Sequence, residues 1–476
     1  MNTASRRDVL RVGGLAIVAL LLGKGSPEPV GAARRKTALA SARNISPHNT
    51  ATRNREALLK VLTNSDVLLT FTPGDYLIDN SGTPIVIENF EGTLVMQPDA
   101  RLVFTDSTRG GLVFVGGSGA VFRGLRTVFQ DRPAQRVDAR ECVEIRNTLD
   151  TVVQNVSVDG SAAGGLLFGG CVRPSVWGAT ITNTMADGLH FANCQDARAD
   201  DVLTEDTGDD GLAFLNYGAG PDRYGGLATK VRVRRSGTRG IAVVGQRDVL
   251  VREFSVEGTA CSGLYCAYEA AYSTRVPSNV RFEGGTVTNA GRSGGCAPSN
   301  HGIEYSDVES VGFENIRVVS PESRGVSGSA PGGTVRLTGI EVRGASTSGF
   351  DLTEGKIHLG DLICKETGGT GFSVRHADLL EYRKLESINA STANRLHRAF
   401  SIEHSARVEG GELHVIDDQD LATGYKVLTD GRQAGSLGVI YADIANGKLE
   451  VENHSSLKVQ VVRVQDAPPC SDGQKH

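Results

Sequence analysis

The sequence repeats one pattern at Thr184–Phe191 (TMADGLHF) and Thr207–Phe214 (TGDDGLAF). In each copy, a glycine is followed by an apolar residue, a variable residue and a second apolar residue. The two glycines, Gly188 and Gly211, are 23 residues apart. Apolar residues at every second position are typical of a β-strand with one buried face, so the variable residue between them, such as His190, is predicted to face solvent. A fixed step of this length indicates a solenoid in which each repeat forms one coil.

The glycine unit recurs along most of the chain. It starts at Gly165, Gly188, Gly211, Gly240, Gly263, Gly302, Gly325, Gly349 and Gly371. Most steps are 22 to 24 residues, which is room for about three short strands and their turns. Two longer steps, of 29 and 39 residues, predict inserts at Asn216–Gly226 and at roughly Glu269–Asn300. We expect these inserts on the rim of a binding groove.

Composition agrees with an all-β chain. The 476 residues include 59 glycines and only 5% aromatic residues, which favours many short strands over helices. The net charge of -5 and the pI near 6.1 give no sign of a nucleic-acid partner or of an anionic membrane surface. A carbohydrate or small-molecule partner fits this balance better.

We predict that residues 1–32 are a signal peptide. The pair Arg6-Arg7 precedes an apolar run, Val12–Leu22, that is too short to span a bilayer comfortably. Small residues at Val30-Gly31-Ala32 offer a cleavage site. The pattern resembles a twin-arginine export signal, and an ordinary secretory signal is the alternative. Both predict a secreted or periplasmic protein without a stable membrane anchor.

The next segment, residues 33–65, is predicted to be a linker followed by a short amphipathic helix at Thr52–Leu62. A strand, a Pro-Gly turn and a second strand follow at Val67–Ile78. This order resembles the opening of right-handed parallel β-helix proteins, in which the helix caps the open end of the solenoid. We therefore predict one right-handed parallel β-helix domain over 66–466 and a flexible tail over 467–476.

The eight cysteines are too few for a disulfide scaffold in a chain of this length. Cys171 and Cys194 are 23 residues apart, so we expect them on adjacent coils. A disulfide and two stacked buried thiols both fit that spacing.

Stacked coils turn equivalent positions into columns. The residues just before the glycines are Gly164, Asp187, Asp210, Arg239, Ser262, His301, Arg324, Ser348 and Thr370, and Asp209 comes one position earlier. Asp-Gly is an ordinary turn signal, since Asp bonds to the local backbone and Gly accepts positive φ. Three carboxylates on coils about 4.8 Å apart repel one another, however, unless a cation, a proton or a function offsets the cost. We interpret Asp187, Asp209 and Asp210 as a catalytic cluster.

The same residues resemble the polygalacturonase family of glycoside hydrolases. That family carries Asn-Thr-Asp-Gly, then Asp-Asp about one coil later, then Gly-His-Gly, then Arg-Ile-Lys. Met185–Gly188 looks like the first motif, keeping Asp and Gly, and Gly208–Gly211 looks like the second. Thr238–Gly240 has Arg in place of His, and Gly263–Tyr265 has neither Arg nor Lys.

The resemblance implies inverting hydrolysis of glycosidic bonds in a polysaccharide or oligosaccharide, with no cofactor. Asp209 would be the general acid, and Asp187 and Asp210 would activate water. The predicted substrate-binding residues are His190, Arg239, Tyr265, His301 and Glu304.

Two alternatives use the same residues. In pectate-lyase-like β-helices, aspartates hold Ca²⁺ and an Arg or Lys abstracts a proton, so the three aspartates could form a calcium site with Arg239 as the base. A non-catalytic glycan-binding solenoid is the third possibility, with the acid cluster as a structural calcium site.

Overall fold

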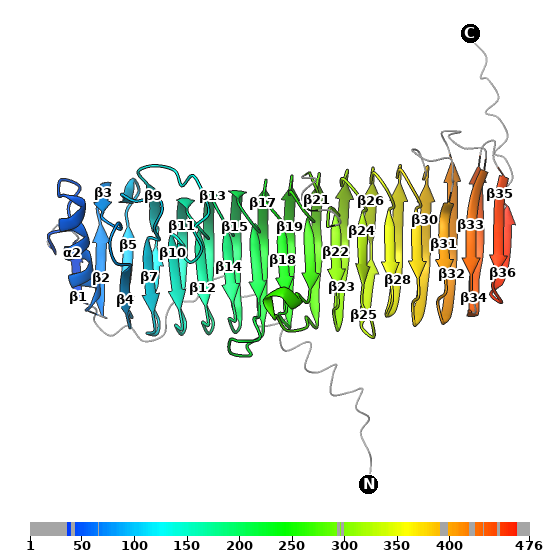
Figure 1. Cartoon of the computed structure of the whole chain (residues 1–476), viewed down its shortest axis with the longest axis horizontal. Helices are drawn as coiled ribbons and strands as arrows, with labels where there is room; N and C mark the ends of the chain where they lie inside the picture. The colour runs from blue at the N-terminus through cyan, green and yellow to red at the C-terminus, as the bar shows by residue number, and fades with distance from the viewer. Residues whose placement is uncertain are drawn as a thin grey trace, which may run out of the picture. The chain divides into compact units, whose positions relative to one another are not determined.

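The computed structural model describes residues 36–39, 43–64, 66–292, 296, 299–390, 398–417, 424–431, 433–444 and 448–463. The predicted signal peptide over 1–32 and the predicted tail over 467–476 lie outside these residues. From Lys36 onward the described chain is nearly all β-structure, and its successive coils stack side by side (Figure 1). Among the described residues, no helix has the length and apolar character needed to cross a bilayer.

The described strands form two parallel sheets, one of 15 strands and one of 21. The 15-stranded sheet contains β4 (Ile85–Glu88), β7 (Leu112–Val115), β10 (Val143–Arg146), β12 (Leu166–Gly169), β14 (Leu189–Ala192), β16 (Leu212–Leu215), β18 (Ile241–Val244), β20 (Leu264–Ala267), β22 (Ile303–Ser306), β24 (Val326–Ser329), β27 (Phe350–Thr353), β29 (Phe372–Arg375), β31 (Arg398–Glu403), β33 (Gly424–Asp430) and β35 (Lys448–His454). Each coil contributes one of these short strands.

The 21-stranded sheet carries the longer strands. It contains β1 (Lys36–Leu39), β2 (Val67–Phe71), β3 (Gly74–Ile78), β5 (Thr93–Met96), β6 (Ala100–Phe104), β8 (Val121–Arg123), β9 (Arg126–Phe129), β11 (Val152–Ser161), β13 (Ser175–Thr184), β15 (Ala197–Thr207), β17 (Gly226–Arg234), β19 (Val249–Glu257), β21 (Val280–Thr288), β23 (Ser310–Val319), β25 (Thr334–Thr338), β26 (Ile340–Arg343), β28 (Lys356–Lys365), β30 (Leu379–Ile388), β32 (Arg407–Asp417), β34 (Ala434–Ile444) and β36 (Lys458–Arg463). Many of them contain a residue with positive φ near their middle, such as Asn155 at 52° and Asp201 at 53°. That residue divides the strand in two, which accounts for the expected three strands per coil.

The predicted register is confirmed in the core. Phe168 pairs with Phe191 and Phe191 pairs with Phe214, and their rings stack at 5.2 and 5.1 Å between centroids. The glycines that precede these strands have a packing role. A Cβ atom on Gly211 would lie 2.4 Å from a methyl group of Val233, one on Gly188 would lie 2.6 Å from the methyl group of Thr204, and neither glycine has positive φ. The turn explanation is therefore wrong for them, since it is space for an inward side chain that requires glycine.

The N-terminal cap is also confirmed. The helix α2 (Ala51–Leu62) begins after Thr50, whose side chain accepts a hydrogen bond from the Arg53 amide. Its buried residues include Leu58 and Leu62, which join the solenoid core. The segment expected to be a linker contains β1, which pairs in parallel with β2.

One insert has the predicted form and the other differs. The loop from Asn216 to the start of β17 is present, and its Tyr217 forms an antiparallel bridge with Thr274. The predicted insert Glu269–Asn300 contains the regular strand β21, so its extra residues fall into two loops, before and after that strand. The first of these loops includes the 3-10 helix η2 (Ala270–Tyr272). A step between glycines shows how many residues are added, and it cannot show how they are divided.

The cysteines also separate into two kinds. Cys171 and Cys194 are buried free thiols, so the disulfide alternative for that pair is wrong. A disulfide joins Cys261 to Cys296, which the sequence spacing had not indicated. It ties the loop after β21 to the turn before β20.

Candidate active site

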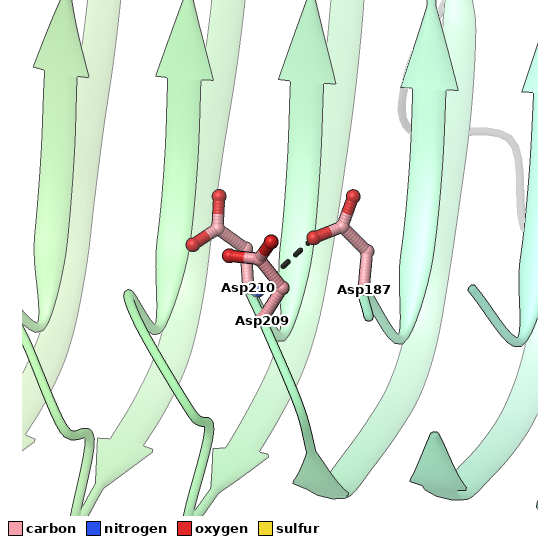
Figure 2. A group of neighbouring side chains, drawn as sticks. All are labelled: Asp187, Asp209 and Asp210. Carbon is pink, nitrogen blue, oxygen red and sulfur yellow. Dashed lines mark hydrogen bonds between the residues drawn. The ribbon is translucent and has the colours of Figure 1, made fainter. Parts of the chain in front are cut away.

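The three aspartates lie in the turns that lead into two neighbouring short strands. Asp187 precedes β14, and Asp209 and Asp210 precede β16, so the stacking of coils brings their carboxylates together (Figure 2). One oxygen from each carboxylate lies within 4.8 Å of the others. Asp187 Oδ1 also accepts a hydrogen bond from the Asp210 backbone amide at 3.0 Å. The three carboxylates therefore form one cluster.

His190 is the partner of Asp187. Its Nδ1 lies 2.8 Å from Asp187 Oδ2, and the residue is only 8% exposed. Burial lowers the pKa of His190, but attraction to Asp187 and the nearby acids outweighs it and leaves that pKa above the usual value. Its Nε2 is buried and makes no hydrogen bond within the described part of the chain. The sequence had predicted that this strand position faces solvent, which is wrong for His190.

Asp209 is paired with a residue that the sequence patterns had not singled out. Arg136, in the segment between β9 and β10, places Nη1 2.7 Å from Asp209 Oδ2. This hydrogen bond is the largest of the effects that raise the pKa of Arg136. The only sequence signal for this contact is the long interval between Phe129 and Val143.

Asp210 is the most enclosed of the three aspartates, with 5% of its surface exposed. Thr238 Oγ1 lies 2.5 Å from Oδ1 of Asp210 and 2.5 Å from Oδ1 of Asp209. The Arg239 backbone amide donates to the same Asp210 oxygen at 3.0 Å. Burial, followed by repulsion from Asp187, raises the pKa of Asp210 to about 7, although Arg239 opposes the shift.

Arg239 is held by two further residues. Its Nη2 lies 2.8 Å from Glu269 Oε1, and its guanidinium carbon lies 4.2 Å from the centre of the Tyr265 ring. Burial lowers the pKa of Arg239, but Asp210 and Glu269 more than compensate, so its pKa lies above the usual value. The side chain of Arg239 is therefore held by β20 and by the loop that follows it.

Other outward positions on neighbouring strands are buried as well. Ala213 and Ala242 are fully buried although they point away from the core, and Ala242 packs with Tyr265 in a separate small apolar cluster. Tyr217, from the other insert, lies close enough to Asp187 and Glu269 for their charges to add to the effect of burial, which raises its pKa. The long steps in the sequence predicted the inserts but could not identify Tyr217 or Glu269.

His301 and Glu304 lie three coils beyond Asp210, and both contact Ser262. Ser262 Oγ lies 2.5 Å from Glu304 Oε2 and accepts from the His301 amide at 3.2 Å. Ser299 donates to the other Glu304 oxygen at 3.0 Å. Burial, with a smaller effect of Arg324, lowers the pKa of His301 to about 4. Tyr265 pairs in register with Glu304 and connects this pair to the rest of the site.

Glu141 is a further residue that the sequence analysis missed. Its Oε2 is buried without a hydrogen bond among the described residues, and burial raises its pKa. It lines a cavity of about 150 Å³ together with Arg109, Arg140 and Arg146, and its charge acts on His190. A larger hollow, about 1220 Å³, lies on the 21-stranded sheet between β23 and β36 and contains none of the predicted site residues.

No protein-family model and no curated protein sequence matches the chain. Several solved β-helix structures are similar in shape. A mannuronan C-5 epimerase module from Azotobacter vinelandii has 9% identity and a TM-score of 0.48, covering 64% of this chain and 95% of its own. The catalytic unit of an α-1,3-glucanase from Streptomyces thermodiastaticus has 12% identity and a TM-score of 0.45, covering 93% and 72%. A polygalacturonase from Erwinia carotovora has 14% identity and a TM-score of 0.49, covering 67% and 95%.

Proposed function

We propose that this protein is an exported enzyme that hydrolyses glycosidic bonds in a polysaccharide or oligosaccharide. The observation that carries the proposal is the unequal surroundings of three converging carboxylates. Asp210 has a pKa near 7 in an enclosed position, whereas Asp187 and Asp209 each contact a basic side chain. Carboxyl groups whose environments push their pKa values apart are suited to opposite acid and base roles. Export rests on residues 1–32 of the sequence alone.

We assign the general acid to Asp209, whose side chain is the more exposed of the two paired aspartates, at 24% against 15% for Asp187. Asp209 gives a proton from Oδ1 to the leaving oxygen of the glycosidic bond. Arg136 on Oδ2 then stabilises the carboxylate that remains.

Asp187 is assigned as the base. It takes a proton from the water that attacks the anomeric carbon, so one proton is given and one is taken in each turnover. Both of its oxygens are fixed, one by the Asp210 amide and the other by His190. A carboxylate held in this way is suited to orienting a water molecule.

The carboxyl groups of inverting glycosidases are usually roughly 6.5–9.5 Å apart, and those of retaining enzymes roughly 5–5.5 Å. The closest oxygens in this cluster lie within 4.8 Å. The anomeric form of the first product, followed by ¹H NMR, therefore tests the proposed inversion directly.

The calcium-dependent lyase is the weaker candidate on geometric grounds. Ca²⁺ takes 6–8 oxygen ligands, yet five of the six carboxylate oxygens already contact a donor or a basic side chain. Arg136 and Arg239 add positive charge beside the cluster. We infer that these residues do not fit a resident Ca²⁺. Arg239 is also unsuited to act as a base, because Glu269 and Asp210 stabilise its charged form.

A screen of polysaccharides tests the proposal. Wild-type protein and the Asp209→Asn variant are incubated in chelator with α- and β-glucans, polygalacturonate and alginate, and new reducing ends are measured. We expect the wild type to cleave one of these polymers and the variant to lose at least about 100-fold in rate. Unsaturated products that disappear in chelator would indicate a lyase. Binding without any product would indicate a glycan-binding solenoid.

A further inference from the structure

Thr238 occupies an unusual position between the two aspartates of one turn. Its hydroxyl oxygen lies 2.5 Å from Oδ1 of Asp209 and 2.5 Å from Oδ1 of Asp210. A hydroxyl group carries a single proton and can donate it to only one acceptor. If both carboxylates were ionised, one of these two short contacts would bring two lone pairs together. A second proton, on one of the two carboxyl groups, makes both contacts favourable.

The surroundings indicate which aspartate carries that second proton at rest. The second oxygen of Asp209 is already engaged, since it lies 2.7 Å from Arg136 Nη1. Asp210 is enclosed and lies against Asp187, which favours the protonated form; burial and this repulsion raise its pKa to about 7. The charged or titratable groups that act on these two carboxyls are Arg136, Asp187, His190, Tyr217 and Arg239.

We infer that Thr238 is a positioning residue whose hydroxyl passes a proton from Asp210 to Asp209. This inference rests on the proposed function. At rest, Asp210 donates to Thr238 and Thr238 donates to Asp209. In the transfer, the Asp210 proton moves to Thr238 Oγ1 while the Thr238 proton moves to Asp209 Oδ1. Two O–H bonds break and two form, and Asp209 becomes the acid that faces the substrate.

The arrangement explains how an enclosed carboxyl group serves an open site. Asp210 keeps a proton near neutral pH because it is buried, but burial also keeps it away from a polymer. Asp209 is the more accessible of the two, and its Oδ2 is held by Arg136. Thr238 connects the two, so that neither residue has to combine both properties.

Infrared spectroscopy of the full chain tests the shared proton without any substrate. The probe is the C=O stretch of protonated carboxyl groups, followed across pH in wild type, Asp210→Asn, Thr238→Val and Thr238→Ser. Thr259→Val is the matched control, because among the described residues its buried hydroxyl donates to the Cys261 carbonyl and to no carboxylate. We expect a band near neutral pH in wild type that Asp210→Asn removes. Thr238→Val should shift both its frequency and its midpoint, whereas Thr238→Ser and Thr259→Val should leave both unchanged.

The inference is overturned if wild type has no protonated carboxyl group near neutral pH. It is equally overturned if Thr238→Val keeps the wild-type band and midpoint. If Thr238→Val does not fold, Thr238→Ala replaces it in the same comparison. Because these spectra require no turnover, they can support the shared proton even if no polysaccharide is cleaved.

A kinetic comparison tests the transfer itself, on whichever polymer the screen identifies. Thr238→Val should lower kcat by about 10- to 100-fold with KM unchanged, and Thr238→Ser should restore it to within a few-fold. An unchanged kcat in Thr238→Val, with hydrolysis intact, contradicts the transfer while leaving the proposed hydrolysis in place.

Discussion

Arg136 and Asp209 are in contact across the solenoid, with 2.7 Å between Nη1 and Oδ2 and 73 positions between them in sequence. The contact joins a loop that carries no repeat to the one aspartate that we assign as the general acid. It also places a positive charge where a carboxylate remains after proton transfer.

Arg136→Ala should impair activity far more than stability. The pair is half exposed on the arginine side, so its loss should cost only about 0–1 kcal/mol of unfolding free energy. The rate should fall at least roughly 10-fold, because Asp209 loses the group that fixes its orientation. Denaturant unfolding and reducing-end assays measure the two effects. Arg173→Ala is the control, since Arg173 makes a similar pair with Asp150 at 2.7 Å outside the site; equal losses in both variants would exclude a specific role for Arg136.

Asp210→Asn should stabilise the protein at alkaline pH. The raised pKa means that the folded state binds the Asp210 proton more tightly than the unfolded chain does. Its contribution is present at low pH and declines as pH rises from about 4 to about 7. Asparagine cannot ionise, so the free energy of unfolding of the variant should rise relative to that of wild type over this pH range. The difference between a pKa of about 7 and the usual pKa of 3.8 sets an upper limit of about 4 kcal/mol on this gain in unfolding free energy.

Urea unfolding at about pH 5 and about pH 8 measures that gain. Asp75→Asn is the control, because hydrogen bonding to Arg101 holds the pKa of Asp75 below its usual value and outside this window. A difference between wild type and Asp210→Asn that does not change with pH would show that Asp210 is ionised throughout.

The two buried histidines of this face should respond to pH with opposite signs. His190 has a raised pKa, so its stabilising contribution is present below about pH 6.5 and is lost as pH rises through the folded pKa. His301 has a pKa lowered to about 4, so it costs stability as pH falls below about 6.5. Hence His190→Gln should destabilise the folded protein more at about pH 5.5 than at about pH 9. His301→Gln should destabilise it less at about pH 5.5 than at about pH 9. Urea unfolding curves at both pH values measure the two effects. If both variants lose more stability at the same pH, one of the two pKa directions is wrong.

The disulfide should hold the loop after β21 in place. Cys261 and Cys296 are 35 residues apart, for which loop-closure entropy predicts about 3–4 kcal/mol of stabilisation. Cys296→Ser should lower the free energy of unfolding by up to this amount. It should also loosen the contact between Ser299 and Glu304. Peptide mapping without reduction should find this one disulfide among the cysteines of the described residues. Alkylation of Cys171 and Cys194 should require unfolding, and a mapped bridge between them would contradict the structure.

The solenoid and the meeting of the three aspartates could be predicted from the sequence. A coil repeats by translation along one axis, so residues 23 positions apart fall on neighbouring coils. Asp187 and Asp210 are separated by that step, and the structure joins them at 3.0 Å. The inward apolar positions followed from the same rule, because a strand alternates its faces residue by residue.

The properties of those aspartates depended on residues that follow no repeat. Asp209 and Asp210 are adjacent in sequence, yet Arg136 contacts one and enclosed surroundings shift the pKa of the other. Arg136 and Glu269 lie in loops. Loop sequences do not repeat with the 23-residue spacing of the coils, so that spacing cannot predict where their side chains lie. Where such a loop folds back depends on the packing of the whole surface. Sequence therefore determined that three carboxylates meet, and only the tertiary structure decided which of them keeps a proton.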